Sequence, residues 1–175
     1  RDLTPVKELS LIPFPTQELF AADISKFDLI IFDQYGLQGI LPPQYLDNIS
    51  KFVFSGGALL DIVGKKHLTK DSLINSPIKQ ILPTIPLENI SNKMFKPELT
   101  KVGKLHPITN KLKNNYKEKP WGEWTNYTRS QSTSGKVLLH HESDPLLAVD
   151  NVGKGRVVQI LSSDSWVWQK SLDNK

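Results

Sequence analysis

The sequence predicts one three-layer α/β domain, with a mostly parallel sheet and an antiparallel hairpin near the C-terminal end. Three observations favour this class. Two apolar runs, residues 27–33 and 58–63, are nearly continuous rather than alternating, as in strands that helices cover on both faces. A helical apolar pattern separates them, which makes a right-handed strand–helix–strand unit. Short apolar runs around a glycine-containing turn then predict the hairpin.

Composition limits the function classes. The chain has 175 residues, of which 38% are hydrophobic and 23% charged, enough for one domain with a substantial core. No apolar run approaches the ~18 residues of a membrane span. The absence of cysteine excludes disulfides, thiolate metal sites and thiol catalysis. No motif points to a cofactor, so we expect none.

The elements before the second strand follow in order. An apolar run at residues 9–13, closed by prolines, is typical of an edge strand or an extended lead-in. Thr16 is a suitable cap for a short helix that ends near Ser25. After the strand at 27–33, proline at Pro43 suits the first turn of the next helix. The apolar stripe of that helix comprises Tyr45, Ile49, Phe52 and Val53.

Both strands of the unit should be central. We therefore expect near-complete burial in adjacent parallel strands of Ile30, Ile31, Leu59, Leu60 and Ile62.

The second half is less regular at first and then rich in strands. Four prolines within residues 72–100 argue against long elements there, although 78–82 is a candidate short helix. Lysine outnumbers glutamate seven to two over residues 96–119, which is typical of a solvated face. The predicted C-terminal strands are residues 136–140, 146–150 and 156–161, the last two joined by a hairpin turn at 151–155.

With these elements placed, the chain resembles the glutamine amidotransferase-like (class I) domains of large bacterial membrane proteins, in which the domain lies beside a von Willebrand A-like region. The resemblance covers nearly the whole chain and depends on the order and spacing of several stretches. The matching stretches are Glu8–Pro15, Phe27–Asp33, Leu41–Gly64, His106–Thr109, Pro145–Leu147, Val152–Val157, Leu161–Asp164 and Trp166–Trp168. It implies a flavodoxin-like sheet, and a fragment that lacks the family's first strand and last helix.

The catalytic chemistry of that family needs a cysteine thiolate on a tight turn after a central strand. The equivalent turn here lies near Gly64, and no Cys, Ser or Thr follows before Thr69. Lys65 and Lys66 occupy the turn instead, and we expect both amines to be exposed, protonated and unreactive. No catalytic residue is therefore assigned.

Ligands in α/β folds bind at the carboxyl edge of the sheet. The candidate ligand-binding residues at that edge are Asp33, Tyr35, Gly64, Lys65, His67, Asp164 and Trp166. The competing interpretation of Trp166 and Trp168 is that both anchor a core or an interface. The four histidines lack metal-ligand spacing, so no metal site is expected.

These observations favour a catalytically inactive amidotransferase-like domain that serves as a binding or interaction module of a larger membrane-anchored bacterial protein. The alternatives are a hydrolase or amidotransferase with a non-cysteine nucleophile, and a carbohydrate-binding domain of the trehalose-utilisation type. The expected partners are other domains of the parent protein or another protein, and the small-molecule ligand stays open. Only three arginines are present, which argues against nucleic acid. We expect a soluble domain, membrane-associated through its parent, with no direct insertion by this segment.

Overall fold

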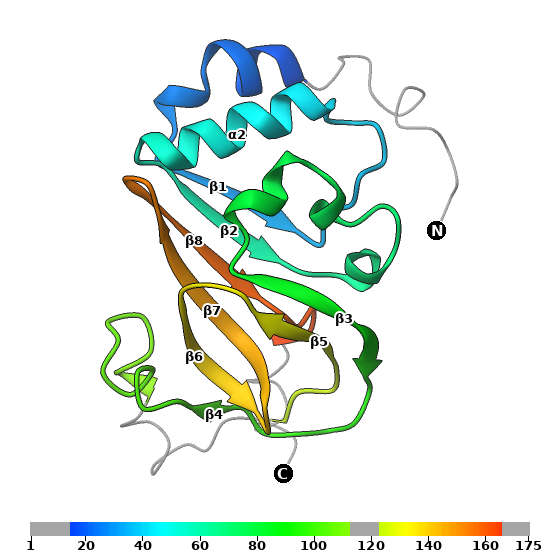
Figure 1. Ribbon diagram of the computed structural model, residues 1–175, viewed down its shortest axis with the longest axis vertical. Helices are drawn as coiled ribbons and strands as arrows, with labels where there is room; N and C mark the ends of the chain where they lie inside the picture. Colours follow the sequence, from blue (N-terminus) through cyan, green and yellow to red (C-terminus); the bar gives the residue numbers. More distant parts are fainter. Residues whose placement is uncertain (1–14, 113–122, 166–175) are drawn as a thin grey trace.

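The computed structural model describes residues 15–112 and 123–165, and they form a mixed α/β fold (Figure 1). A six-stranded sheet has the order β1-β2-β8-β7-β6-β4, and β3 and β5 form a separate two-stranded sheet. The strands are β1 (Leu29–Asp33), β2 (Ala58–Ile62), β3 (Thr84–Ser91), β4 (Glu98–Leu99), β5 (Tyr127–Ser132), β6 (Lys136–His141), β7 (Asp144–Val152) and β8 (Gly155–Ile160). The helices are α2 (Pro43–Ser55) and the short η1 (Glu18–Ala22), η2 (Ile24–Lys26), η3 (Lys65–Leu68), η4 (Leu73–Asn75) and η5 (Pro77–Ile81). The α/β class is thus confirmed.

The large sheet is mixed, with two parallel and three antiparallel strand pairings. β1 pairs with β2 and β2 with β8 in parallel, whereas β8–β7, β7–β6 and β6–β4 are antiparallel. The sheet is therefore less parallel than expected, because β7, β6 and β4 extend the three parallel strands as antiparallel neighbours. The predicted hairpin is confirmed as β7–β8, with Gly153 at φ 58° in its turn.

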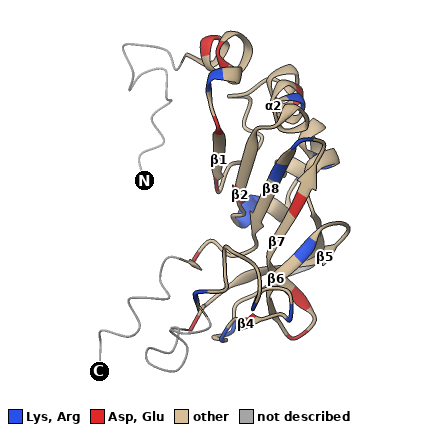
Figure 2. Cartoon of the chain, turned by 90° about the vertical axis from the view of Figure 1, so that its left-hand side faces the viewer, with Lys and Arg blue, Asp and Glu red and all other residues tan. Residues whose placement is uncertain are grey.

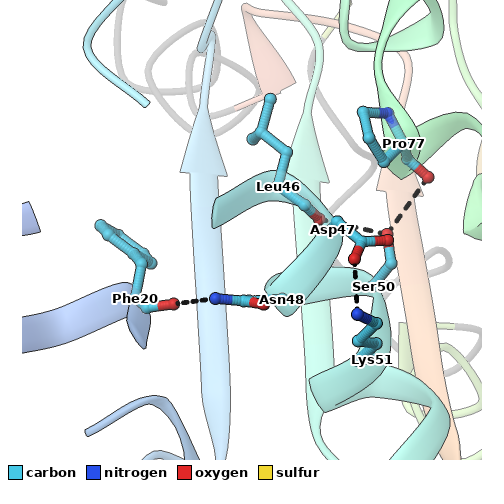
Figure 3. A network of polar contacts seen from close by, with 7 residues as sticks. All are labelled: Phe20, Leu46, Asp47, Asn48, Ser50, Lys51 and Pro77. Carbon is cyan, nitrogen blue, oxygen red and sulfur yellow. Dashed lines mark hydrogen bonds and ion pairs between the residues drawn. The ribbon is translucent and has the colours of Figure 1, made fainter. Parts of the chain in front are cut away.

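Helix α2 begins as predicted, with proline in its first turn. Side-chain hydrogen bonds attach it on two sides: Asn48 Nδ2 donates to Phe20 O over 3.0 Å, and Ser50 Oγ donates to Pro77 O over 3.2 Å (Figure 3). The exposed side carries an ion pair between Lys51 and Asp47. The helix therefore connects η1 to η5 across the sheet.

One face of β1, β2 and β8 packs under α2. The buried apolar side chains of this core are Ile30, Phe32, Leu59 and Val157 from the sheet with Leu46, Ile49 and Val53 from α2. Their alternation corrects the expected burial: Ile31 is 54% exposed, and Leu60 and Ile62 are half-buried. Among the described residues no helix covers the opposite face of β1, so only every second residue there is buried.

The β3–β5 pair contradicts the expectation that residues 72–100 hold no long element. β3 spans eight residues and includes Pro86, which a two-stranded sheet tolerates because each strand has a free edge. Together with β6 and β7, this region encloses a second apolar core. That core comprises Phe95, Trp124, Tyr127, Leu138, Leu139, Leu146 and Leu147.

Candidate functional site at the carboxyl edge of the sheet

Three parallel strands end side by side, so the turns that follow them share one edge of the sheet. Asp33 of β1 pairs in register with Ile62 of β2, which in turn pairs with Ile160 of β8. The residues after these positions are therefore brought to the same edge (Figure 1). This arrangement agrees with the expected placement of Asp33, Gly64 and Asp164.

The β1 and β2 turns are in close contact. Gln34 has φ 52°, an uncommon left-handed conformation for a residue with a side chain, and its amide donates to Ile62 O over 2.8 Å. A Cβ on Gly64 would lie 2.7 Å from Gln34 Cβ. Gly64 itself is extended, at φ −115°, a conformation that any residue can adopt. Glycine is therefore needed at position 64 because a side chain would not fit beside Gln34, and not because of the backbone conformation.

The two lysines of the turn differ in environment. Lys65 is exposed, as expected. Lys66 is half-buried, because its aliphatic stem lies across Gly36, where any Cβ would overlap it. The stem of Lys66 is thus covered, as in a long side chain that snorkels, and the expected exposure of its amine stays a prediction.

His67 is buried, with 6% of its surface exposed. Its Nδ1 lies 3.5 Å from Ser72 Oγ, and its Nε2 has no hydrogen-bond partner among the described residues. Burial lowers the pKa of His67 from 6.5 to about 4, so the imidazole is neutral at pH 7. The one hydrogen-bonding neighbour of the imidazole among the described residues is the buried Ser72 hydroxyl.

Of the candidate residues at the end of β1, Tyr35 packs against the core and Asp33 is exposed. The Tyr35 ring stacks on Phe32 with centroids 4.9 Å apart. Burial raises the pKa of the Tyr35 hydroxyl. The hydroxyl lies near the backbone of Leu41 but has no hydrogen-bond partner among the described residues. Asp33 is exposed at the end of its strand.

Asp164 lies in a polar cluster that ties the end of β8 to the start of β5. Its Oδ2 accepts from Thr125 Oγ1 over 2.6 Å and from Asn126 Nδ2. Ser162 Oγ donates to Asn126 O, and the Asp164 amide donates to Ser162 Oγ. These bonds occupy the carboxylate in a structural role. Trp166, the remaining candidate, and Trp168 lie outside the described residues.

Two polar groups were missed by the sequence reasoning. Asp61, 2% exposed, accepts from Gln159 Nε2 over 2.9 Å, and Gln159 Oε1 accepts from Thr84 Oγ1 over 2.6 Å. Burial raises the pKa of Asp61 from 3.8 to about 6. A charged residue inside the apolar run of β2 was the available signal.

The second group joins β5 to β7. Asp144 Oδ2 accepts from Tyr127 Oη over 3.0 Å and from Arg129 Nε over 2.8 Å. The carboxylate is buried, whereas the guanidinium is half-exposed at a groove of about 490 Å³. No feature of the β5 sequence indicated this pair.

Two further cavities lie away from the carboxyl edge. One of about 590 Å³ is at the amino end of β1, beside the end of α2. The other, about 380 Å³ and mainly apolar, is lined by Ile108, Leu112 and Trp124 with residues of β6, β7 and β8. Within residues 15–112 and 123–165, no cluster of His, Asp and Glu is arranged to hold a metal ion. In the same part of the chain, no helix is long and apolar enough to cross a membrane.

Comparison with known proteins gives similarity of fold. Neither a family model nor a curated protein matches the chain. A cytoplasmic protein from Salmonella typhimurium LT2 is similar with a TM-score of 0.67 and 24% identity, over 93% of this chain and 74% of that chain. A second Salmonella typhimurium cytoplasmic protein gives 0.66 and 21%, over 92% and 68%. A β-galactosidase from Rahnella sp. R3 gives 0.57 and 15%, over 86% of this chain and 22% of that chain. At these identities the likeness shows the fold alone.

Proposed function

We propose that this chain is a catalytically inactive, flavodoxin-like domain of the class I amidotransferase-like type, and that it acts as an interaction module within a larger protein. The observation that carries the proposal is an apolar sheet face that the described residues leave open. Two kinds of support come from the geometry, one from the edge where catalysis would occur and one from this face.

The carboxyl edge supports the absence of catalysis. At the nucleophile position the chain has Gly64 followed by the exposed Lys65. His67, the histidine near this position, is buried and neutral, and the carboxylate of Asp164 already accepts two side-chain hydrogen bonds. Acyl transfer by a triad needs a nucleophile, a base and an orienting acid in mutual contact, and these residues do not supply them.

The open sheet face consists of outward-pointing side chains in registered rows across β1, β2 and β8. Ile31, Leu60 and Val158 form the central row. Ile31 is 54% exposed and Leu29 47%, Leu60 is half-buried, and Val158 packs against the second apolar core, so the open part of the face lies on β1 and β2. β1 is also an edge strand, so its outer backbone groups are unpaired within the described sheet. A contiguous apolar face beside a free strand edge is typical of a protein interface.

Two experiments test the parts separately. Ammonia release from glutamine should not exceed a no-protein control, and release proportional to protein concentration would contradict inactivity.

For the interface, Ile31→Asp should abolish binding of the chain to the remaining parts of its parent protein, measured by calorimetry. The matched control is Ile40→Asp, which changes a side chain of similar exposure outside the open sheet face. Equal loss in both variants, or none in Ile31→Asp, would refute the interface.

A further inference from the structure

A second surface combines positive charge with exposed apolar side chains. We call residues 101–111 the lysine loop. Within it, Leu105 is 81% exposed, Ile108 53% and Val102 42%. Lys101, Lys104 and Lys111 are exposed, and no acidic residue occurs between them. None of the three ion pairs found among the described residues includes these lysines.

The exposure of these side chains is built into an ordered segment. Thr100 Oγ1 donates to Val137 O over 2.7 Å, and Gly103 lies so close to Leu138 O that any Cβ there would overlap it. Thr109 Oγ1 donates to Gly103 O over 2.5 Å. The loop is thus attached to β6 at its start and closed on itself, which fixes Leu105 in an outward position.

Helix-like turns set the spacing of the apolar side chains. The Leu105 amide donates to Val102 O over 3.0 Å, and the Thr109 amide donates to His106 O over 2.9 Å. Val102, Leu105 and Ile108 therefore recur at every third residue, with a lysine directly before the first two. Figure 2 shows both basic and acidic segments around β4, the strand that leads into this loop.

We propose that the lysine loop binds the surface of an anionic lipid bilayer, with its lysines at the headgroups and its apolar side chains in the interface. Apolar side chains beside lysines are the combination that an anionic bilayer surface binds. Nucleic acid would attract the lysines but offers nothing for Leu105, and arginine, the usual reader of phosphate and base edges, is absent from the loop. An acidic protein would need a pocket for each protruding side chain, whereas lipid adapts to them.

This contact differs from the insertion of a membrane span, which the sequence does not support. It also uses residues distinct from the open sheet face, so it does not rest on the interaction proposed above. Its depth is limited to the length of the exposed side chains, because Gly103 and Thr100 hold the backbone of the loop against β6.

Vesicle co-sedimentation of the full 175-residue chain tests the proposal. Vesicles of equal parts phosphatidylglycerol and phosphatidylcholine should bind the chain, and vesicles of phosphatidylcholine alone should bind it far more weakly. Replacing Lys101, Lys104 and Lys111 by Gln should weaken binding on the order of 100-fold, from about fivefold for each lysine. Leu105→Ser should weaken it roughly tenfold.

Matched variants separate the loop from general charge and hydrophobicity. Replacing Lys70, Lys79 and Lys154 by Gln removes the same charge from exposed positions elsewhere and should leave binding within about twofold of the wild type. Ile40→Ser is the control for Leu105→Ser. Equal binding to both vesicle types, equal loss in the loop and control variants, or retention on DNA without vesicle binding would overturn the proposal.

Discussion

Two buried groups should give the folded chain opposite responses to acid over the same range of pH. The pKa of Asp61 is raised from 3.8 to about 6, so the folded state bears the cost of a charged buried carboxylate above pH 6 and loses that cost as the pH falls to 3.8. The pKa of His67 is lowered from 6.5 to about 4, so the folded state bears no cost above pH 6.5 and the full cost of a buried imidazolium below pH 4.

The two contributions are similar in size. A tenfold change in proton affinity corresponds to about 1.4 kcal/mol, so each group changes the free energy of unfolding by about 3 kcal/mol across its window. Acidification between about pH 6.5 and pH 4 therefore stabilises the fold through Asp61 and destabilises it through His67. We expect these two terms to cancel in the wild type.

Denaturant unfolding of the wild type, Asp61→Asn and His67→Gln at several pH values between 4 and 7 separates them. Asn keeps an oxygen that accepts from Gln159, so the hydrogen bond survives while the titration is lost. Relative to the wild type, Asp61→Asn should lose about 3 kcal/mol on acidification and His67→Gln should gain about 3 kcal/mol, whatever their stability at pH 7. The double variant should follow the wild type. Difference curves that change by less than about 1 kcal/mol would refute the burial argument.

Three further predictions concern stability, measured as the free energy of unfolding in denaturant. Leu59→Ala should destabilise by about 2–5 kcal/mol, because Leu59 is 1% exposed, whereas Ile31→Ala should cost less than about 1 kcal/mol; equal costs would contradict the one-sided sheet. Gly64→Ala should cost about 1–3 kcal/mol, because its Cβ would crowd Gln34, and a neutral effect would show that the two turns separate freely. Asp144→Ala should cost about 1–3 kcal/mol by leaving the buried Tyr127 hydroxyl without its acceptor, while Arg129→Gln should cost less; the reverse order would contradict this account.

The elements with strong local signals were predictable from the sequence. The two central strands follow from apolar runs, α2 from its proline start and apolar stripe, and the β7–β8 hairpin from its glycine turn. β5 was missed because its residues, Tyr127–Ser132, are mostly polar and carry no apolar alternation. β3 was missed because Pro86 argues against a central strand, and only its partner shows that it lies in a two-stranded sheet.

The one-sided burial of β1 was not predictable from its composition. Leu29–Phe32 is apolar throughout, which fits coverage on both faces, and only the packing shows that alternate side chains are exposed. At the candidate site, the position of Gly64 and the exposure of Lys65 follow from the end of the preceding strand. The burial of His67 and the contact of Lys66 with Gly36 depend on turns that come together only in the fold.

The proposed role of the open sheet face is tested most directly by thiol labelling, because the chain has no cysteine of its own. Ile31→Cys places one thiol on that face, and Gln44→Cys places one on the exposed start of α2. In the isolated chain both thiols should react rapidly with a maleimide. Within the full-length parent protein, the cysteine at position 31 should react far more slowly while that at position 44 keeps its rate. Unchanged reactivity at position 31 in the parent would contradict an interface on this face.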